Sequence, residues 1–251
     1  PRLVQELDGT LLNNMKRQAK RASSTNPADY KIYINPGHGG YDSDDRLMYL
    51  YPIFVNQNVQ EGYTREQSFW ESTSNLDKGL RLDTILRDLG FQTKMSRITN
   101  TTADDRSLSG ISAEASTWNA DFMLSIHSNA GNPSNYILHL HSGVTPGDPY
   151  GLGGYCNSYD DNGDGVIDRK VYDVVSQEVC DKARAITTLM GENQYSNQIT
   201  CWSREPNIAG DKTFARTVMG WSNGYGVMRW LKVPGTISEG MMHDYLPETY
   251  R

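Results

Sequence analysis

The stretch Lys31-Ile-Tyr-Ile-Asn-Pro-Gly-His-Gly-Gly40 decides the fold of this chain. Its first half is a short apolar run typical of a buried strand, and its second half is a glycine-rich turn that carries His38. A second stretch, Ser125-Ile-His-Ser-Asn-Ala130, places His127 at the end of another apolar run. An open α/β sheet gathers its ligand-binding groups at the carboxyl ends of its strands. The two segments therefore predict an α/β fold with both histidines at one edge of the sheet.

Strand-like and helical segments alternate along the rest of the chain. Leucines and isoleucine at 76, 80, 82, 85, 86 and 89 predict a helix over 72–89 with an apolar face toward the core, and Gly90 ends it. We expect further helices around 111–118 and over 169–190, and strands over 91–96, 121–127, 136–141, 225–231 and 234–239. This alternation predicts a three-layer α/β/α fold with a mixed, mostly parallel central sheet.

The length of 251 residues fits one large domain with insertions. Residues 1–30 have the pattern of a helical arm followed by a linker, and 31–251 form the expected single domain. Polar segments without a clean period at 41–70, 143–168 and 191–224 are interpreted as insertions.

Composition excludes several classes of protein. The net charge is −6, with 24 basic and 30 acidic residues and no basic run, which argues against a nucleic-acid or anionic-membrane partner. No segment approaches the ~20 apolar residues that span a bilayer, so we expect no membrane insertion. Cys156, Cys180 and Cys201 are too few for a disulfide framework, and one bridge or three reduced thiols both fit.

Two histidines at neighbouring strand ends, with a carboxylate from the segment between them, would make a three-ligand metal site with one open position. Glu61, Glu66 and Glu71 are all available in that segment. Glu71 is favoured because it begins the predicted helix, where a carboxylate gains from the helix dipole. The residues therefore predict a metal site on His38 and His127 and favour Glu71 as the third ligand, with Glu66 and Glu61 as the alternatives.

At this point the chain resembles a known family, the zinc-dependent N-acetylmuramoyl-L-alanine amidases of the amidase-3 type. The resemblance rests on four ordered blocks over roughly 31–245: Pro36-Gly-His-Gly-Gly40; Glu71-Ser-Thr-Ser-Asn-Leu76 with Ser96-Arg97; Ser125-Ile-His-Ser-Asn-Ala130; and Lys232-Val-Pro-Gly-Thr-Ile-Ser-Glu-Gly240. It implies one catalytic Zn²⁺ on His38, Glu71 and His127, and a peptidoglycan substrate cut between N-acetylmuramic acid and L-alanine. Glu239 is implied as the general base and then the general acid.

The chain also departs from the family pattern. The gap from His38 to Glu71 is long, and Met241-Met-His-Asp244 follows Glu239 in place of the usual aromatic and Ser-Asn. Asn129, His141 and His243 are further candidates for contact with the substrate or with the metal ligands. His139 shares a strand face with His141, and both could line the cleft, contact substrate or point to solvent.

The segment 160–168 resembles the first nine positions of an EF-hand calcium loop. Its candidate Ca²⁺ ligands are Asp160, Asn162, Asp164, Val166 (through its backbone carbonyl) and Asp168. Val171 stands where a bidentate Glu should complete the site, so a hydrated acidic turn is the alternative. The insertion before the 169–190 helix, together with that helix, is a candidate lid over the active site.

Two other functions compete with a peptidoglycan hydrolase. One is a cell-wall-binding module with weak or no turnover, and the other is a zinc exopeptidase acting on ordinary peptides. The family resemblance implies work outside the cytoplasmic membrane, in the periplasm or at the cell surface of a bacterium. An activator protein is compatible with this expectation, but the sequence does not identify one.

Overall fold

The structure is a computed structural model that describes residues 26–40, 45, 55–56, 59–60, 70–129, 138–148, 156–159, 169–172, 176–197, 207–220 and 225–242. Its strands are β1 (Lys31–Pro36), β2 (Val55–Asn56), β3 (Val59–Gln60), β4 (Gln92–Met95), β5 (Phe122–Asn129), β6 (Leu138–His141), β7 (Cys156–Tyr159), β8 (Arg169–Tyr172), β9 (Asn207–Gly210) and β10 (Gly235–Met242). Its helices are α2 (Glu71–Asp88), α3 (Leu108–Thr117), α4 (Gln177–Ser196), α5 (Asp211–Thr217) and α6 (Gly226–Arg229), with the 3₁₀ turns η1 (Pro27–Asp29) and η2 (Thr102–Asp104).

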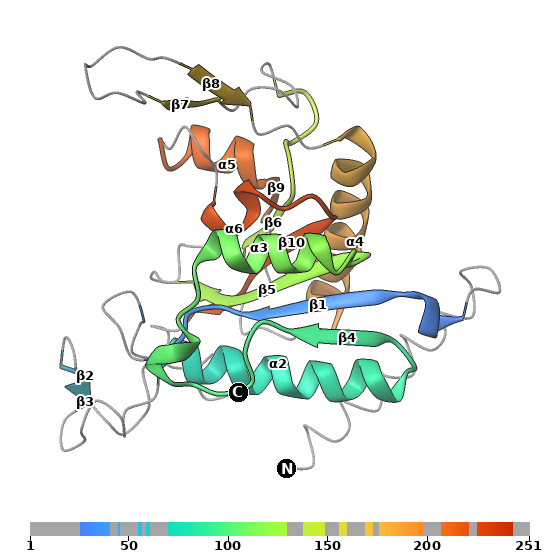
Figure 1. Ribbon diagram of the computed structural model, residues 1–251, viewed down its shortest axis with the longest axis vertical. Helices are drawn as coiled ribbons and strands as arrows, with labels where there is room; N and C mark the ends of the chain where they lie inside the picture. Colours follow the sequence, from blue (N-terminus) through green and yellow to red (C-terminus); the bar gives the residue numbers. More distant parts are fainter. Residues whose placement is uncertain are drawn as a thin grey trace.

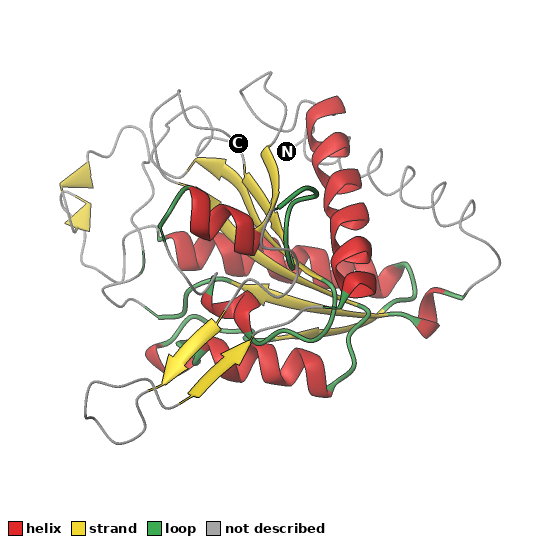
Figure 2. Cartoon of the chain, turned by 90° about the horizontal axis from the view of Figure 1, so that it is seen from above, coloured by secondary structure: helices red, strands yellow, loops and turns green. Residues whose placement is uncertain are grey.

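Six strands form the central sheet in the order β4-β1-β5-β10-β6-β9 (Figure 1). All neighbouring pairs are parallel except β10 and β6, which are antiparallel. Helices cover both faces of the sheet (Figure 2). The predicted three-layer α/β/α fold with a mixed, mostly parallel sheet is therefore confirmed.

The alternation of side chains along the strands builds two cores. Ile34 of β1 and Ile126 of β5 point toward α2 and pack with Leu86. Tyr33 lies one residue before Ile34, and Met123 lies three residues before Ile126. Both therefore point to the opposite face, where they pack against α3, α5 and α6. This period of two is what a sheet buried on both faces requires.

Helix α2 occupies the range predicted for it, but its apolar stripe is only partly buried. The side facing the sheet carries Glu71, Asn75, Gly79 and Leu86, whereas Leu80 is 39% exposed. Gly79 lies against the ring of Pro36, which a β-carbon would approach to 2.7 Å. The face of α2 nearest the sheet edge is therefore polar, because it serves the site described below.

Three expectations for the second half of the chain were wrong. The predicted helix 169–190 is strand β8 followed by α4, which begins after Ser176 because that hydroxyl caps the backbone N–H of Val179. The segment 191–224 is not an irregular insertion throughout, because it holds the end of α4, β9 and α5. The strand predicted over 225–231 is helix α6, whose Val227 and Met228 are buried, and Leu231 follows one helical turn later.

Helix α4 belongs to the layer that covers the sheet. Its buried positions Cys180, Ala183, Thr187 and Gly191 form one stripe that faces β6, β9 and β10. Cys180 is a free, buried thiol. This packing places α4 in the layer that covers the sheet, while most of the insertion that the sequence suggested as the rest of the lid lies outside the described residues. Residues 1–25 and most of 41–70 and 143–168 lie outside the described residues, so the expected arm and insertions remain predictions.

Candidate metal centre

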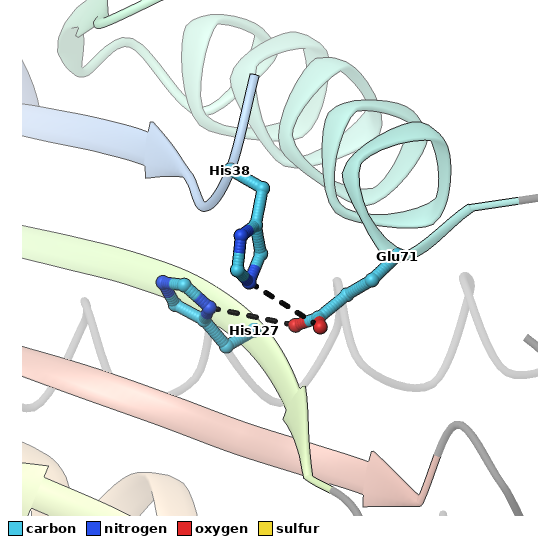
Figure 3. Close-up of side chains that lie close together, drawn as sticks. All are labelled: His38, Glu71 and His127. Atoms are coloured by element: carbon cyan, nitrogen blue, oxygen red, sulfur yellow. Dashed lines mark ion pairs between the residues drawn. The ribbon is translucent and has the colours of Figure 1, made fainter. Parts of the chain in front are cut away.

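His38, Glu71 and His127 converge at the carboxyl edge of the sheet, as Figure 3 shows. His38 follows β1, Glu71 is the first residue of α2, and His127 lies near the end of β5. The Nε2 atom of His38 lies 3.3 Å from Glu71 Oε2, and the Nδ1 atom of His127 lies 3.4 Å from Glu71 Oε1. The sequence thus placed three side chains in one site although 89 positions separate the outer two.

Glycines make the approach of the two histidines sterically feasible. A β-carbon at Gly37 would lie 2.1 Å from His127 Nε2, so any side chain there would displace the imidazole. His38 itself has φ 58° and Gly40 has φ 67°, both in the left-handed region. A non-glycine residue in that region is uncommon and often marks a functional site. The backbone of this turn is therefore bent to aim the His38 ring at Glu71.

The Glu71 carboxylate is held by the backbone and by its own helix. Its Oε1 accepts hydrogen bonds from the Ser128 backbone N–H at 2.8 Å and from the Asn75 side-chain amide at 3.3 Å. The same amide also donates to the Gly37 carbonyl at 3.2 Å. Burial opposes ionisation of Glu71, but hydrogen bonds from His127 and His38 outweigh it and hold the pKa well below its usual value.

These three residues fit a divalent metal by their chemistry. Two imidazoles and one carboxylate are a donor set typical of a catalytic zinc with an open position. Ligands about 2.0–2.1 Å from a tetrahedral zinc stand about 3.3 Å apart, which matches the two histidine–carboxylate distances. All three donor atoms lie within 4.8 Å of one another. The group can therefore hold a metal ion.

Arg97 ties together the two chain segments that carry His38 and Glu71. Its guanidinium donates to the carbonyls of Pro36 and Gly37, both at 3.0 Å, and to the carbonyl of Ser72 at 2.7 Å. Burial lowers the pKa of Arg97 to about 10, which keeps it charged at neutral pH. The sequence showed this arginine only as part of a motif, and its bracing role required the three-dimensional contacts.

Glu239 lies beside the three candidate ligands. It stands opposite His127 in the parallel register of β10 and β5. Burial raises the pKa of Glu239, and the nearby Glu71 raises it further, while the imidazoles of His127 and His38 oppose the shift. A carboxyl group whose pKa is raised in this way is suited to taking up and returning a proton near neutral pH.

A cavity of about 700 Å³ opens at this edge of the sheet. Its wall includes His38, His127 and Glu239, together with residues from the starts of α3 and α6. Tyr225 and Arg106 also line it, although the sequence had singled out neither. Burial raises the pKa of Tyr225 to about 12, and Glu239 contributes, so its hydroxyl keeps its proton as a hydrogen-bond donor.

Lys78 is another charged residue that sequence reasoning missed. It lies two turns after Glu71 on α2, and burial lowers its pKa to about 8 although Glu71 and Glu239 both favour the charged form. The spacing of seven residues from Glu71 puts both on one helix face, which is the signal that could have revealed it. A positive charge close to both carboxylates balances part of their negative charge.

The other predicted residues are placed less centrally. Asn129 ends β5, opposite Met242 of β10. His141 is 1% exposed, and it lies on the α4 side of the sheet, where its Nδ1 is 3.0 Å from the Ser142 carbonyl oxygen. His141 is not among the described residues that line the cavity, and its suggested contact with substrate or with the metal ligands stays a prediction. His243, Glu61, Glu66 and the candidate calcium ligands at 160–168 lie outside the described residues.

A metal-binding group and an adjacent carboxyl in one cavity at a sheet edge define the class of site found in mononuclear metal hydrolases. The chain belongs to the N-acetylmuramoyl-L-alanine amidase family (Amidase_3), whose sequence profile matches residues 32–240. No curated protein matches the chain.

Solved structures agree with this fold. Cwp6 from Clostridium difficile is 19% identical with a TM-score of 0.54, and the match covers 88% of this chain but only 26% of Cwp6. The N-acetylmuramyl-L-alanine amidase Ami1 from Mycobacterium smegmatis is 14% identical with a TM-score of 0.50, and the match covers 86% of this chain and 83% of Ami1. The chain thus spans about a quarter of Cwp6, and at these identities the likeness shows the fold.

None of the described helices is long and apolar enough to cross a membrane.

Proposed function

We propose that this chain is a zinc-dependent N-acetylmuramoyl-L-alanine amidase that cleaves the amide between the lactyl group of N-acetylmuramic acid and L-alanine. Family membership supports the choice of bond. The observation that carries the proposal is the convergence of His38, Glu71 and His127 with Glu239 at one cavity. His38, Glu71 and His127 would hold the zinc.

Zinc, when bound, supplies two effects: it lowers the pKa of a water molecule, and it polarises the amide carbonyl. Glu239 accepts a proton from the attacking water as the water oxygen bonds to the carbonyl carbon. Glu239 then delivers that proton to the departing L-alanine nitrogen as the C–N bond breaks. Tyr225 and Arg106 supply hydrogen-bond donors along the cavity wall for the polar groups of the glycopeptide.

The test is hydrolysis of purified peptidoglycan and of a defined muropeptide, followed by detection of new L-alanine amino termini. Glu239→Gln should keep about one zinc per chain and lose activity by about 10²- to 10⁴-fold, because it removes the group that transfers the proton. His38→Ala should lose both zinc and activity. Glu192→Gln is the matched control, because it makes the same chemical change at an exposed position of α4.

The same assay separates the two rival functions. Binding of peptidoglycan by the zinc-loaded wild type without release of L-alanine would favour a binding module. Cleavage of ordinary peptides but not of muropeptides would favour an exopeptidase. Either result would overturn the proposed amidase.

The proposed substrate sets the expected location of the protein. Peptidoglycan lies outside the cytoplasmic membrane, so we infer that the chain works in the periplasm or at the surface of a bacterium. We retain 31–251 as the catalytic domain, with 1–30 as an attached arm. A structural Ca²⁺ in 160–168 and an activator protein remain predictions for calcium titration and co-purification.

A further inference from the structure

The regular pairing of strand β10 ends at Glu239, the residue proposed to transfer the proton. On the β5 side the register runs without interruption from Gly235 to Glu239 and then shifts before Met242. On the β6 side the pairing described ends with Glu239 opposite Leu138. Gly240 follows immediately, and glycine has more backbone freedom than any other residue. Regular strand pairing therefore holds the backbone before Glu239 but not the backbone immediately after it.

A side chain from α4 bonds to the backbone at this point. The Gln194 amide Nε2 donates to the Gly240 carbonyl at 2.7 Å. Its Oε1 lies 2.6 Å from His139 Nε2, and His139 belongs to β6. Three segments that are distant in the sequence are therefore joined at the residue after Glu239.

The chemistry of this chain of bonds allows one arrangement. The Gly240 carbonyl can only accept, so Gln194 must present its NH₂ group to Gly240 and its oxygen to the imidazole. His139 must then carry its proton on Nε2 and donate it to Gln194 Oε1. If His139 carried its proton on Nδ1 only, both partners of the Gln194 amide would be acceptors, and its oxygen would face one of them without a donor. The Gly240 carbonyl and the Nε2–H group of His139 together determine the orientation of the amide.

The surroundings of His139 keep it in that form. Its side chain is 1% exposed, and its Nδ1 has no hydrogen-bond partner in the part of the chain that the structure describes. A proton on Nδ1 would be buried without an acceptor, and burial lowers the pKa of His139 accordingly. Gly191, one turn before Gln194, lets α4 lie close: a β-carbon there would be 2.8 Å from Ile208 Cδ1 and 3.6 Å from His139 Cδ2.

We propose that Gln194, oriented by His139, is a positioning residue that holds the end of β10 so that Glu239 faces the metal ligands. The proposal rests on the proposed amidase function only for the role of Glu239. Helix α4 and the buried His139 of β6, which take no part in the proposed proton transfer, thereby help to position Glu239.

Activity measurements test the consequence for catalysis. Gln194→Met keeps the size of the side chain and removes both hydrogen bonds, and we expect kcat to fall about 10- to 100-fold with KM and zinc content unchanged. His139→Gln retains an N–H donor and should keep more activity than His139→Leu. Thr187→Val is the control, because it removes another buried α4–β10 hydrogen bond, to Thr236, three residues before Glu239. It should lower thermal stability and leave kcat intact.

A spectroscopic measurement tests the hydrogen bond itself. Gly240-Met241 is the single Gly-Met step in the sequence, so labelling glycine carbonyls with ¹³C and methionine nitrogens with ¹⁵N leaves one correlation peak. Loss of the Gln194 bond should move the Gly240 carbonyl shift in Gln194→Met, while Thr187→Val should leave it in place.

The two readouts separate failure of this inference from failure of the amidase assignment. An inactive wild type would refute the proposed amidase function. An unmoved carbonyl peak in Gln194→Met would refute the hydrogen bond from Gln194 to the Gly240 carbonyl. A moved peak with unchanged kcat in an active enzyme would show that the bond exists but does not position Glu239. That outcome would also overturn the inference.

Discussion

Replacing Gly37 with alanine should abolish tight zinc binding while the protein remains folded. The new β-carbon would lie 2.1 Å from His127 Nε2, against about 3.5 Å for an ordinary contact between heavy atoms. The imidazole must therefore retreat by about 1.4 Å. Metal–ligand distances tolerate changes of only about 0.2 Å, so His127 could no longer serve as a ligand.

Changes that merely disturb the support of a ligand lower metal affinity by about 10–100-fold, and losing a ligand should cost more than that. We therefore expect zinc affinity to fall by at least about a hundredfold in Gly37→Ala. Competition against a chromophoric chelator measures the affinity, and elemental analysis of the dialysed protein measures the stoichiometry.

Gly90→Ala is the matched control for this prediction. Gly90 has φ 93°, but a β-carbon there meets nothing closer than Pro27 Cβ at 3.7 Å. The variant should lose about 1–2 kcal/mol of stability from backbone strain and keep its zinc. If Gly37→Ala binds zinc as tightly as the wild type does, the assignment of His127 as a ligand through Nδ1 is refuted.

Three further predictions follow from the contacts of the site and of α3. Asn75→Ala should lower zinc affinity about 10–100-fold in the same competition assay, because its amide bonds both Glu71 and the Gly37 carbonyl. Arg97→Met should lower the thermal midpoint measured by circular dichroism, because it removes three buried hydrogen bonds to backbone carbonyls, and Arg81→Met on the exposed face of α2 should not. Burial opposes ionisation of Glu114, but hydrogen bonds from Lys94, Tyr33 and Arg106 hold its pKa at about 2. Its stabilising effect should thus be complete above pH 4.5 and vanish as the pH falls toward 2, and Glu114→Gln should flatten urea-unfolding stability over that interval.

The first half of the fold was predictable because its signals are local. The apolar runs that end at His38 and His127 each fill a strand buried on both faces, and glycines mark the turns. The second half was less predictable because short elements there depend on tertiary contacts. The four residues of α6 carry Val227 and Met228, and an apolar run of that length fits a strand equally well.

The same distinction applies to the site. The candidate ligands could be found because a histidine at the end of a predicted parallel strand must lie at the carboxyl edge of the sheet. The residues that support the ligands and Glu239 could not be found in this way. Arg97 and Gln194 bond to the backbone carbonyls of Gly37 and Gly240, and any residue type offers such a carbonyl. The burial of His141 could not be predicted either, because alternation along a strand cannot say which face of an α/β sheet holds the cavity.

The cavity and the helices that support the site lie on opposite faces of the sheet. Residues at the starts of α3 and α6, among them Leu108 and Gly226, line the cavity on one face, so the proposed substrate would approach from that side. A β-carbon at Gly226 would be 2.4 Å from Leu108 Cδ1, so the Leu108 side chain, which is 52% exposed, would have to move to admit a larger residue there. On the opposite face α2 supplies Glu71, and α4 supports β10 through Gln194. Helices thus pack against both faces of the sheet, and the cavity opens on the face of α3 and α6. A glycopeptide bound there, as the proposed function requires, would reach Glu239 without displacing α2 or α4, which support the site from the other face.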